Sequence, residues 1–409
     1  MSDFYIDFAN NQHYTYDDLI KDILCTTHYQ KYCYTNDFYS IFKNIILSLL
    51  LNKDIVVLDY DFTIDEIKKL LGFDNIDESE PITLDHLKHL STRDELIREL
   101  SNVSKSWSLT LFTSGTTGLP KRVKHSFQSL TRFVKISQSK SKDVWGFAYN
   151  PTHIAGIQVF FQALLNGNLI IRLFGLSKNV IFHSISNWHI TNISATPTFF
   201  RLLLPHQGQY PSVQRITTGG EKLDEKLLVK LKMLFPNAKY TNVYASTEAG
   251  TLFAAHNNIF TVKAEQRHLV EIRDGELFIH QSLLVATDFV KDEWYPTGDL
   301  VEVISQEPLS FIFLARRNEM INVGGYKVNP NEVEEVIRSI ESVIDVRVFS
   351  KPNSVLGNIV CCEIVSDSED LEESTIRKYL QSKLQEYKIP RVISFVKEIS
   401  KTRTGKTKR

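Results

Sequence analysis

A run of small hydroxyl residues and glycines, followed by cations, is the feature of this sequence best suited to chemistry. Residues 109–125 read LTLFTSGTTGLPKRVKH. Glycine lets a backbone turn tightly and approach a ligand closely. Exposed amides and hydroxyls donate hydrogen bonds, and Lys121 adds a positive charge. The segment therefore indicates a loop that binds an anion such as the polyphosphate of a nucleotide.

An ordinary loop is the alternative, because Ser, Thr and Gly often gather between periodic segments. The segment is not a Walker A loop, which needs G-x-x-x-x-G-K-[ST]. Its second glycine comes too early, and Leu119 and Pro120 precede the lysine. The C-terminal Gly-Lys-Thr at 405–407 also fails, since Ser400 stands at the required earlier glycine position. By itself the loop predicts phosphate binding and nothing more specific.

The composition is that of an ordinary globular protein. The chain has 409 residues, 43% hydrophobic content and a formal net charge of −1, and this length fits about two or three domains. A near-zero net charge disfavours a general nucleic-acid binder. The N-terminus lacks the apolar region of a signal peptide, and the longest apolar run, residues 45–51, is too short to span a bilayer. We therefore expect a cytoplasmic protein with no nucleic-acid or membrane partner.

The four cysteines fit neither a disulfide framework nor a metal site by their spacing. Cys361 and Cys362 lie in NIVCCEIV, a pattern typical of a buried strand. Both are predicted to be core thiols in a reducing compartment.

Short apolar strands alternate with helical patterns over roughly the first 250 residues. Residues 45–62 read as helix, turn and buried strand. Further along, helices are predicted over residues 126–137, 157–167, 197–204 and 225–235, and strands over residues 144–150, 168–174 and 193–196. Such alternation predicts α/β layers with substantial parallel sheet.

From about residue 255 the pattern changes to strands without long helices between them, over residues 269–280, 300–305 and 309–316. This part is predicted to be antiparallel and barrel-like. A small α+β unit follows. Its first helix is marked by Asn329 as N-cap, Pro330 at the first helical position and Glu332 to close a capping box. The apolar stripe of this helix consists of Val333, Val336, Ile337 and Ile340.

These patterns predict an α/β fold with two domains. Residues 1–317 form a large N-terminal domain of layered α/β sheets with the barrel-like part. Residues 318–409 form a small α+β domain, so the boundary falls at Asn318.

Five further unusual segments follow the glycine-rich loop. They are TTGGE (217–221), NVYASTEAG (242–250), YPTGD (295–299), RRNEMINVGGYKVNPNEVE (316–334) and RTGKTKR (403–409). Together with the loop, they resemble the adenylate-forming superfamily of acyl-CoA synthetases, aryl-CoA ligases, peptide-synthetase adenylation domains and luciferases. The resemblance covers roughly residues 100–409. YTYDDL at residues 14–19 resembles the usual opening of the family, and the resemblance implies that residues 1–100 are a shortened subdomain.

The resemblance implies a reaction in two halves. A carboxylate attacks the α-phosphate of ATP, which gives an acyl-AMP and pyrophosphate. A thiol, either of CoA or of carrier-protein phosphopantetheine, then attacks the acyl carbonyl and expels AMP. ATP, Mg²⁺ and CoA or a carrier protein are thus the implied cofactors and partners, and positioning with charge stabilisation would supply most of the catalysis.

Most of the motif residues match nucleotide contacts of the family. The residues that match its loop over the β- and γ-phosphates are Thr113, Ser114, Gly115, Thr116, Thr117, Gly118 and Lys121. Glu248 matches the magnesium-binding glutamate and Thr247 the contact to the α-phosphate. Tyr244 would stack on adenine, whose amino group Asn242 would face. Taken alone, Glu248 would be a helix-capping acid and Tyr244 a core aromatic.

Ribose and the catalytic lysine are matched further along the chain. Asp299 and Arg316 match the two ribose contacts, although Thr-Gly-Asp alone would be a turn. The strip between adenine and the acyl group is matched by Gly219, Gly220 and Glu221. Lys406 matches the lysine that bridges the acyl carboxylate and the α-phosphate. A solvated basic tail or a nucleic-acid arm is the alternative for this lysine.

The remaining motif residues match moving parts. Asn318 stands where the family usually has an Asp or Lys hinge, and Asn tolerates unusual backbone angles. The resemblance implies that residues 318–409 form a mobile lid that rotates at this hinge. Gly324 and Gly325 match the loop that enters the site for thioester formation and leaves room for pantetheine.

The segment PTHIAG at 151–156 resembles the lining of the acyl pocket. It lacks the aspartate with which amino-acid-activating members hold the α-amine. His153 and Gly156 favour an acyl- or aryl-CoA ligase, although a lone histidine is more often structural. The residues predicted to complete the pocket are Phe199, Thr218, Ala245 and Ser246. Ala245 replaces the usual glycine, and its methyl would narrow the pocket. We expect an aromatic or medium-length aliphatic acid.

Two alternatives remain open. The enzyme could load an acyl carrier protein, or the chain could be a nucleotide- or acyl-binding module that has lost catalysis. Ala245, Asn318 and the short N-terminus support the second alternative. Retention of Glu248, Asp299, Lys121 and Lys406 argues against it, and we expect an AMP-forming acid–thiol ligase.

Overall fold

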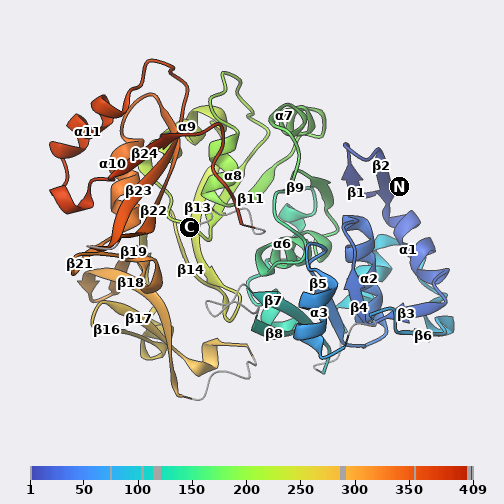
Figure 1. Ribbon diagram of the computed structural model, residues 1–409. Coiled ribbons are helices and arrows are strands. Elements are labelled where there is room, and N and C mark those ends of the chain that lie inside the picture. Colours follow the sequence, from blue (N-terminus) through green and yellow to red (C-terminus); the bar gives the residue numbers. More distant parts are fainter. Residues whose placement is uncertain are drawn as a thin grey trace.

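The chain folds into stacked sheets and helices, with a small domain at one end (Figure 1). The structure is a computed structural model. It describes residues 2–73, 76–102, 106–113 (of Thr113 the backbone only), 121–285, 292–353, 356–402 and 407. Among these residues no helix has both the length and the apolar character needed to cross a membrane.

The largest sheet has eight strands in the order β14-β13-β12-β11-β9-β10-β1-β2. Their bounds are β1 Asp3–Asp7, β2 Gln12–Thr15, β9 Val144–Phe147, β10 Leu169–Arg172, β11 Asn192–Ala195, β12 Arg215–Gly219, β13 Lys239–Ser246 and β14 Gly250–Ala255. The six strands from β13 to β1 run parallel, and an antiparallel strand closes each edge. The predicted parallel sheet is thus confirmed.

Helices cover both faces of this sheet. Neighbouring residues of β10 show this, because Ile170 and Ile171 belong to two different hydrophobic cores, as side chains alternate between the faces of a strand. One core contains side chains of α7 (Lys178–Asn187), α8 (Pro197–Leu202) and α9 (Glu225–Leu234). The other contains side chains of α1 (Tyr16–Leu24), α2 (Phe38–Leu50), α4 (Arg93–Leu100), α5 (Phe127–Thr131) and α6 (Ile154–Leu164).

A four-stranded sheet packs against the far side of the second core. It consists of β4 (Tyr32–Tyr34), β5 (Ile55–Leu58), β7 (Ser108–Thr113) and β8 (Lys121–Ser126), in that order. In β5, Ile55 and Val57 join the core shared with α2, while Val56 and Leu58 pack against α3 (Ile64–Leu71). The short strands β3 (His28–Gln30) and β6 (Ser79–Pro81) pair with each other. The first hundred residues therefore supply strands to the eight-stranded and the four-stranded sheet.

One predicted helix, residues 126–137, is wrong in length, since α5 ends at Thr131. The backbone beyond Thr131 is bound by one side chain of α6 and by another just after the end of α6. The amide of Lys135 donates to Gln162 Oε1 (3.0 Å), and its carbonyl accepts from Gln162 Nε2 and Asn166 Nδ2 (both 3.1 Å). These bonds replace the helical ones. Among the apolar residues beyond Thr131, Val134 packs against the core, whereas Phe133 and Ile136 are exposed.

The predicted strands after residue 255 form a separate antiparallel sheet in the order β15-β19-β18-β17-β16. Their bounds are β15 Ile259–Thr261, β16 Val270–Arg273, β17 Glu276–His280, β18 Trp294–Gln306 and β19 Leu309–Arg316. In the described residues β15 and β16 are the edge strands and do not pair with each other. The sheet is therefore an antiparallel series of strands, as in a barrel, but the barrel is not closed. Thr-Gly-Asp at 297–299 lies inside β18 and is not a turn between elements.

The C-terminal domain, called the lid below, is a five-stranded sheet with two helices (Figure 1). Its elements are β20 Ile321–Val323, β21 Tyr326–Val328, α10 Pro330–Arg338, β22 Val343–Asn353, β23 Gly357–Ser366, α11 Glu373–Gln381 and β24 Val392–Phe395. Cys361 and Cys362 are buried in β23, as predicted.

The start of α10 differs from the prediction in one detail. Asn329 is the N-cap and accepts from the amide of Asn331 (2.9 Å), and Pro330 begins the helix. Glu332 does not close a capping box, because its carboxylate pairs with Lys388 at 2.7 Å. A tertiary ion pair thus takes the place of the local bond.

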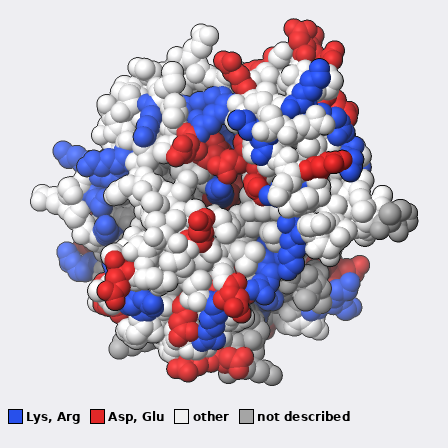
Figure 2. All heavy atoms as spheres, turned by 90° about the vertical axis from the view of Figure 1, so that its left-hand side faces the viewer, with Lys and Arg blue, Asp and Glu red and all other residues white. Residues whose placement is uncertain are grey.

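Figure 2 views the molecule from the side of the lid and the antiparallel sheet. Lysines and arginines lie beside aspartates and glutamates across this face. A mixture of signs agrees with the net charge of −1.

We predict that His125, on β8, makes folding sensitive to acid. Its side chain is buried, and burial lowers its pKa to about 4. Between about pH 6.5 and 4, the histidine is protonated in the unfolded chain, which has the ordinary histidine pKa, but stays neutral in the folded chain. Stability present above this window is therefore lost as the pH falls through it, by up to about 3 kcal/mol.

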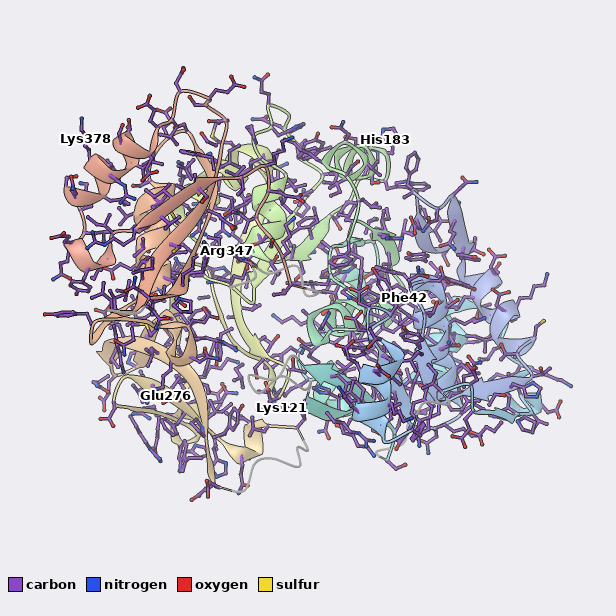
Figure 3. All side chains as sticks on the ribbon, in the orientation of Figure 1. Phe42, Lys121, His183, Glu276, Arg347 and Lys378 are labelled. Carbon is purple, nitrogen blue, oxygen red and sulfur yellow. The ribbon has the colours of Figure 1, made fainter. Side chains whose placement is uncertain are left out.

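Thermal unfolding of His125→Phe between pH 7 and 4.5 checks this expectation. The variant should lose less stability than wild type on acidification. The exposed His183, on the outer side of α7 (Figure 3), provides the matched control His183→Phe. Equal acid slopes for His125→Phe and wild type would contradict the assignment.

Candidate active site

A large cavity, of about 1750 Å³, is bounded by the eight-stranded sheet, the antiparallel sheet and the lid. Residues after the carboxyl ends of β12 and β13 form much of its wall, which is where parallel α/β sheets place their ligands. The predicted site residues that line it are His153, Gly219, Gly220, Glu221, Asn242, Tyr244, Ala245, Ser246, Thr247, Glu248, Asp299, Arg316 and Asn318. Segments far apart in the sequence are thus brought to one cavity.

A buried carboxylate lies at the point where β13, β18 and β19 meet. Asp299 is only 2% exposed and accepts a hydrogen bond of 2.7 Å from the hydroxyl of Tyr244. Arg316 Nε forms an ion pair with its other oxygen at 3.1 Å. Burial, and then the charge of Asp299, raise the pKa of Tyr244 well above its usual value, so the phenol remains a donor. The buried Asp299 is therefore matched by a phenol donor and a guanidinium, which is what a carboxylate in a buried position needs.

The strip at the end of β12 needs glycine for two different reasons. A Cβ at Gly219 would lie 2.6 Å from Val243 Cγ2 on the neighbouring strand. Gly220 has a φ of +81°, which L side chains rarely adopt. The strip therefore has a flat backbone surface next to β13.

Asn242 is held by neighbours on both sides. Its Nδ2 donates to Asn258 Oδ1 (3.1 Å), and its Oδ1 accepts from Thr218 Oγ1 (3.4 Å). Asn258 in turn donates to the carbonyl of Leu223 (2.9 Å). These bonds fix the orientation of the Asn242 amide at the cavity wall.

Glu221 binds two parts of the chain at once. Its Oε2 accepts from the amide of Thr198 at the start of α8 (3.0 Å), and its Oε1 accepts from the amide of Thr407 (2.8 Å). Thr407 also forms an antiparallel bridge with Lys401. The C-terminal tail therefore returns from the lid to the middle of the molecule (Figure 1). Lys406, next to this anchor, lies outside the described residues.

The predicted acyl end of the cavity contains a second buried carboxylate. Asp59 follows β5 and is 5% exposed. Its Oδ2 lies 3.5 Å from His153 Nε2 and accepts from Asn150 Nδ2 at 3.4 Å. His153 is the N-cap residue of α6, so the helix start fixes its position. Asp59 and His153 together place an imidazole and a carboxylate at the cavity surface.

Several predicted residues do not line the cavity. Gly156 is inside α6, where a Cβ would lie 2.4 Å from the carbonyl oxygen of Asn150, so close packing explains this glycine. The predicted Thr218 is buried in β12, with 1% of its surface exposed, and its neighbour Thr217 lines the cavity instead. Phe199 packs edge-on against Phe200.

The other three described residues off the cavity wall belong to segments around it. Lys121 begins β8, which is the edge strand of the four-stranded sheet (Figure 3). Gly324 and Gly325 form the turn between β20 and β21 of the lid. Ser114, Gly115, Thr116, Thr117 and Gly118 lie outside the described residues, as does the side chain of Thr113. The roles of all these residues stay predictions.

Some residues of the cavity wall belong to none of the sequence motifs. Arg347 of β22 lies on the inner side of the lid, whereas Lys378 of α11 points away from it (Figure 3). An arginine between two buried valines on a strand faces the opposite side from them, and this alternation could have indicated it. Asp59 could have been found as an acid directly after a buried parallel strand.

Glu248 is the predicted metal ligand that lines the cavity. In the described part of the chain, no group of three or more His, Cys, Asp or Glu side chains has the arrangement of a protein-made metal site. Mg²⁺ commonly binds through one or two carboxylates, with waters and substrate phosphates completing its coordination. A single glutamate therefore fits Mg²⁺ that arrives with ATP.

Comparison with known proteins agrees with this geometry. The model of the AMP-binding enzyme family matches residues 60–271, and that of the AMP-binding enzyme C-terminal domain matches residues 332–406. A 2-succinylbenzoate–CoA ligase of Listeria monocytogenes is 28% identical, over 78% of this chain and 73% of its own length. Acyl-coenzyme A synthetase ACSM4 of Mus musculus is 26% identical, over 73% of this chain and 59% of its own.

Solved structures share the whole architecture. The o-succinylbenzoate CoA synthetase of Bacillus subtilis, in complex with an acyl-adenylate intermediate, aligns with a TM-score of 0.69 and 19% identity, over 99% of this chain and 94% of its own. ATP-bound MatB of Rhodopseudomonas palustris aligns with a TM-score of 0.73 and 16% identity over the same shares. The chain therefore belongs to the AMP-binding enzyme family, the adenylate-forming superfamily that its sequence motifs resemble.

Proposed function

We propose that this protein is an AMP-forming acid–CoA ligase, which activates a carboxylic acid with ATP and transfers the acyl group to the thiol of CoA. The observation that carries the proposal is the shared cavity. Asp299, Tyr244 and Arg316 form a charged cluster on one wall, and the anchored tail reaches Glu221 on another. A bound nucleotide and Lys406, the residue before Thr407, would meet between these walls.

In the first half-reaction, a carboxylate oxygen of the acid forms a bond to the α-phosphorus of ATP. The bond between this phosphorus and the bridging oxygen breaks, and pyrophosphate leaves with the electron pair. Asp299 accepts hydrogen bonds from the ribose hydroxyls, and the Gly219-Gly220 strip lets adenine and the acyl group lie against backbone. Thr247 donates to the α-phosphate, and Lys406 stabilises its negative charge. Placement and charge stabilisation are the main sources of rate in such transfers.

ATP and Mg²⁺ are bound in a solved structure of the Bacillus subtilis o-succinylbenzoate CoA synthetase. Here Glu248 would hold the metal, which would neutralise phosphate charge when bound.

In the second half-reaction, the thiol sulfur bonds to the acyl carbonyl carbon. The bond from this carbon to the phosphate oxygen breaks, AMP leaves, and the thiol proton is lost to solvent. Gly324 and Gly325 do not line the cavity in the observed lid orientation, so we propose that the lid rotates at Asn318 to bring this turn to the thiol path.

We propose an aromatic or medium-length aliphatic acid as the substrate. Ile154, Val159 and Leu252 supply apolar surface to the cavity. The Asp59 carboxylate nearby is already bound by His153 and Asn150. Among the described residues of this wall, the acid beside the apolar surface is thus occupied by these two side chains, which disfavours selection of an α-amine.

Replacing Ala245 with glycine is expected to widen the acyl pocket. Ala245 lines the cavity on β13, where its methyl takes up space. Removing one methyl should raise the preference for a larger acid over a smaller one by about tenfold, the scale of methylene discrimination in apolar pockets. The kcat/KM ratio for two acids that differ in ring substituents measures this. An unchanged ratio would place the acyl group elsewhere.

The proposal is tested by pyrophosphate release with ATP and Mg²⁺ across a panel of aromatic, aliphatic and amino acids. Hydroxylamine traps the adenylate, so this step needs no CoA. We expect signal with aromatic or medium aliphatic acids, followed by thioester formation on addition of CoA. Signal with amino acids only would overturn the acid class. An adenylate that is transferred to carrier-protein phosphopantetheine and not to CoA would overturn the acceptor.

A further inference from the structure

The lid also contacts the N-terminal domain away from the hinge residue Asn318. In this contact the C-terminal end of α10 faces α9. Lys226 of α9 donates from Nζ to the carbonyl of Arg338 (2.7 Å) and to that of Ile340 (2.8 Å). The last carbonyls of a helix have no partner within it and carry partial negative charge, so a cation there is favourable. One lysine of the large domain thus binds the end of a lid helix.

Neighbouring charges strengthen the fit of these surfaces. Lys222 Nζ pairs with Glu335 Oε2 at 2.6 Å, from the loop before α9 to α10. Deeper in, Arg201 pairs with Asp224 at 2.9 Å on one side, and Arg338 with Glu334 at 3.2 Å on the other. A small cavity of about 30 Å³ between them is lined from both domains. The domains are therefore complementary here in shape and in charge.

The other end of α10 is bound as well. Asn329 Nδ2 and Asn331 Nδ2 both donate to the carbonyl of Leu314 in β19, at 3.2 and 3.1 Å. These contacts lie near Asn318, where a rotation moves atoms least. The Lys226 contacts lie at the opposite end of the helix, so a rotation at the hinge must break them.

We propose that Lys226 is a positioning residue for adenylate formation: it holds the C-terminal end of α10 and so keeps the lid in the orientation that anchors the tail at Glu221. The proposal rests on the proposed function, because it assigns Lys226 to one of the two half-reactions. In thioester formation the lid is rotated and Lys226 has no part. A residue that only supported the fold would affect both halves alike.

The test measures the two half-reactions separately in Lys226→Met. ATP–pyrophosphate exchange with the acid reports adenylate formation. Thioester formation from chemically made acyl-adenylate and CoA reports the second half. Loss of charge-assisted hydrogen bonds of this kind shifts a docking equilibrium by roughly tenfold or more. We expect exchange to fall by about that factor, with thioester formation from the supplied adenylate within about twofold of wild type.

Two matched variants complete the design. Lys226→Arg keeps a cation at the helix end and should retain exchange. Lys232→Met removes an exposed lysine of the same helix and should leave both halves unchanged. If Lys226→Met does not fold, Lys226→Gln is measured with the same expected split.

Equal loss in both halves, or no loss in either, would overturn the role of Lys226. Failure of wild type to form any adenylate would instead overturn the proposed function, so the two failures are distinguishable.

Discussion

Replacing Lys406 with alanine is expected to lower the rate of adenylate formation by about a thousandfold while ATP still binds. Removal of one preorganised group that stabilises transition-state charge typically costs 10² to 10³ in rate. The neighbouring amide, of Thr407, is held by Glu221 at 2.8 Å in the cavity. This anchor limits how far the lysine can be from the reacting carboxylate.

Pyrophosphate release measures the rate, and calorimetric titration with ATP measures affinity. Lys408→Ala removes a cation two residues further along the tail and is the matched control. A rate for Lys406→Ala within a few-fold of wild type would sink the assignment and favour a solvated basic tail. Loss of ATP binding would show that the lysine serves the nucleotide and not the chemistry.

Asp299→Asn is expected to lower kcat/KM for ATP by roughly a hundredfold or more. The carboxylate would make charge-assisted hydrogen bonds to ribose, each worth about 1.5–3 kcal/mol. The substitution also leaves Arg316 without its ion-pair partner. Because the change is small in volume, the fold around β18 should persist.

A ribose-specific readout separates binding from general damage. Wild type should prefer ATP strongly over 2′,3′-dideoxy-ATP, and Asp299→Asn should lose most of that preference. Tyr244→Phe removes only the hydroxyl that donates to Asp299 and keeps the ring, so its preference for ribose should persist. Full discrimination in Asp299→Asn would place the ribose elsewhere.

The layered fold followed from local patterns. Alternating apolar strands and helices predicted the parallel sheet, and the turn-rich strands after residue 255 predicted the antiparallel one. Strand order and partners did not follow. β1 pairs with β10 and β5 with β7, over long stretches of chain, and such pairing depends on how the helices pack between the sheets. The length of α5 shows the same limit. Side chains of α6, and one just after α6, bind the backbone where α5 could have continued.

The site was predictable where the motifs supply its residues. Glu221, Asn242 and Asp299 line one cavity, as the order of the motifs implied. Residues that reach the cavity through tertiary packing carry no motif, and Asp59 and Arg347 are of this kind. Conversely, Gly156 stands in a matching segment, although its closest neighbour is backbone.

The anchor of the tail is made mainly through the backbone of Thr407. Its amide is held by Glu221 and it forms a bridge with Lys401, while its hydroxyl makes one contact, with Thr198 Oγ1 at 3.4 Å. A side chain at 407 that lacks the hydroxyl would lose only that contact, whereas adding or deleting one residue between 401 and 407 would put a different side chain beside the anchor. The spacing of this tail is therefore under stricter constraint than its composition.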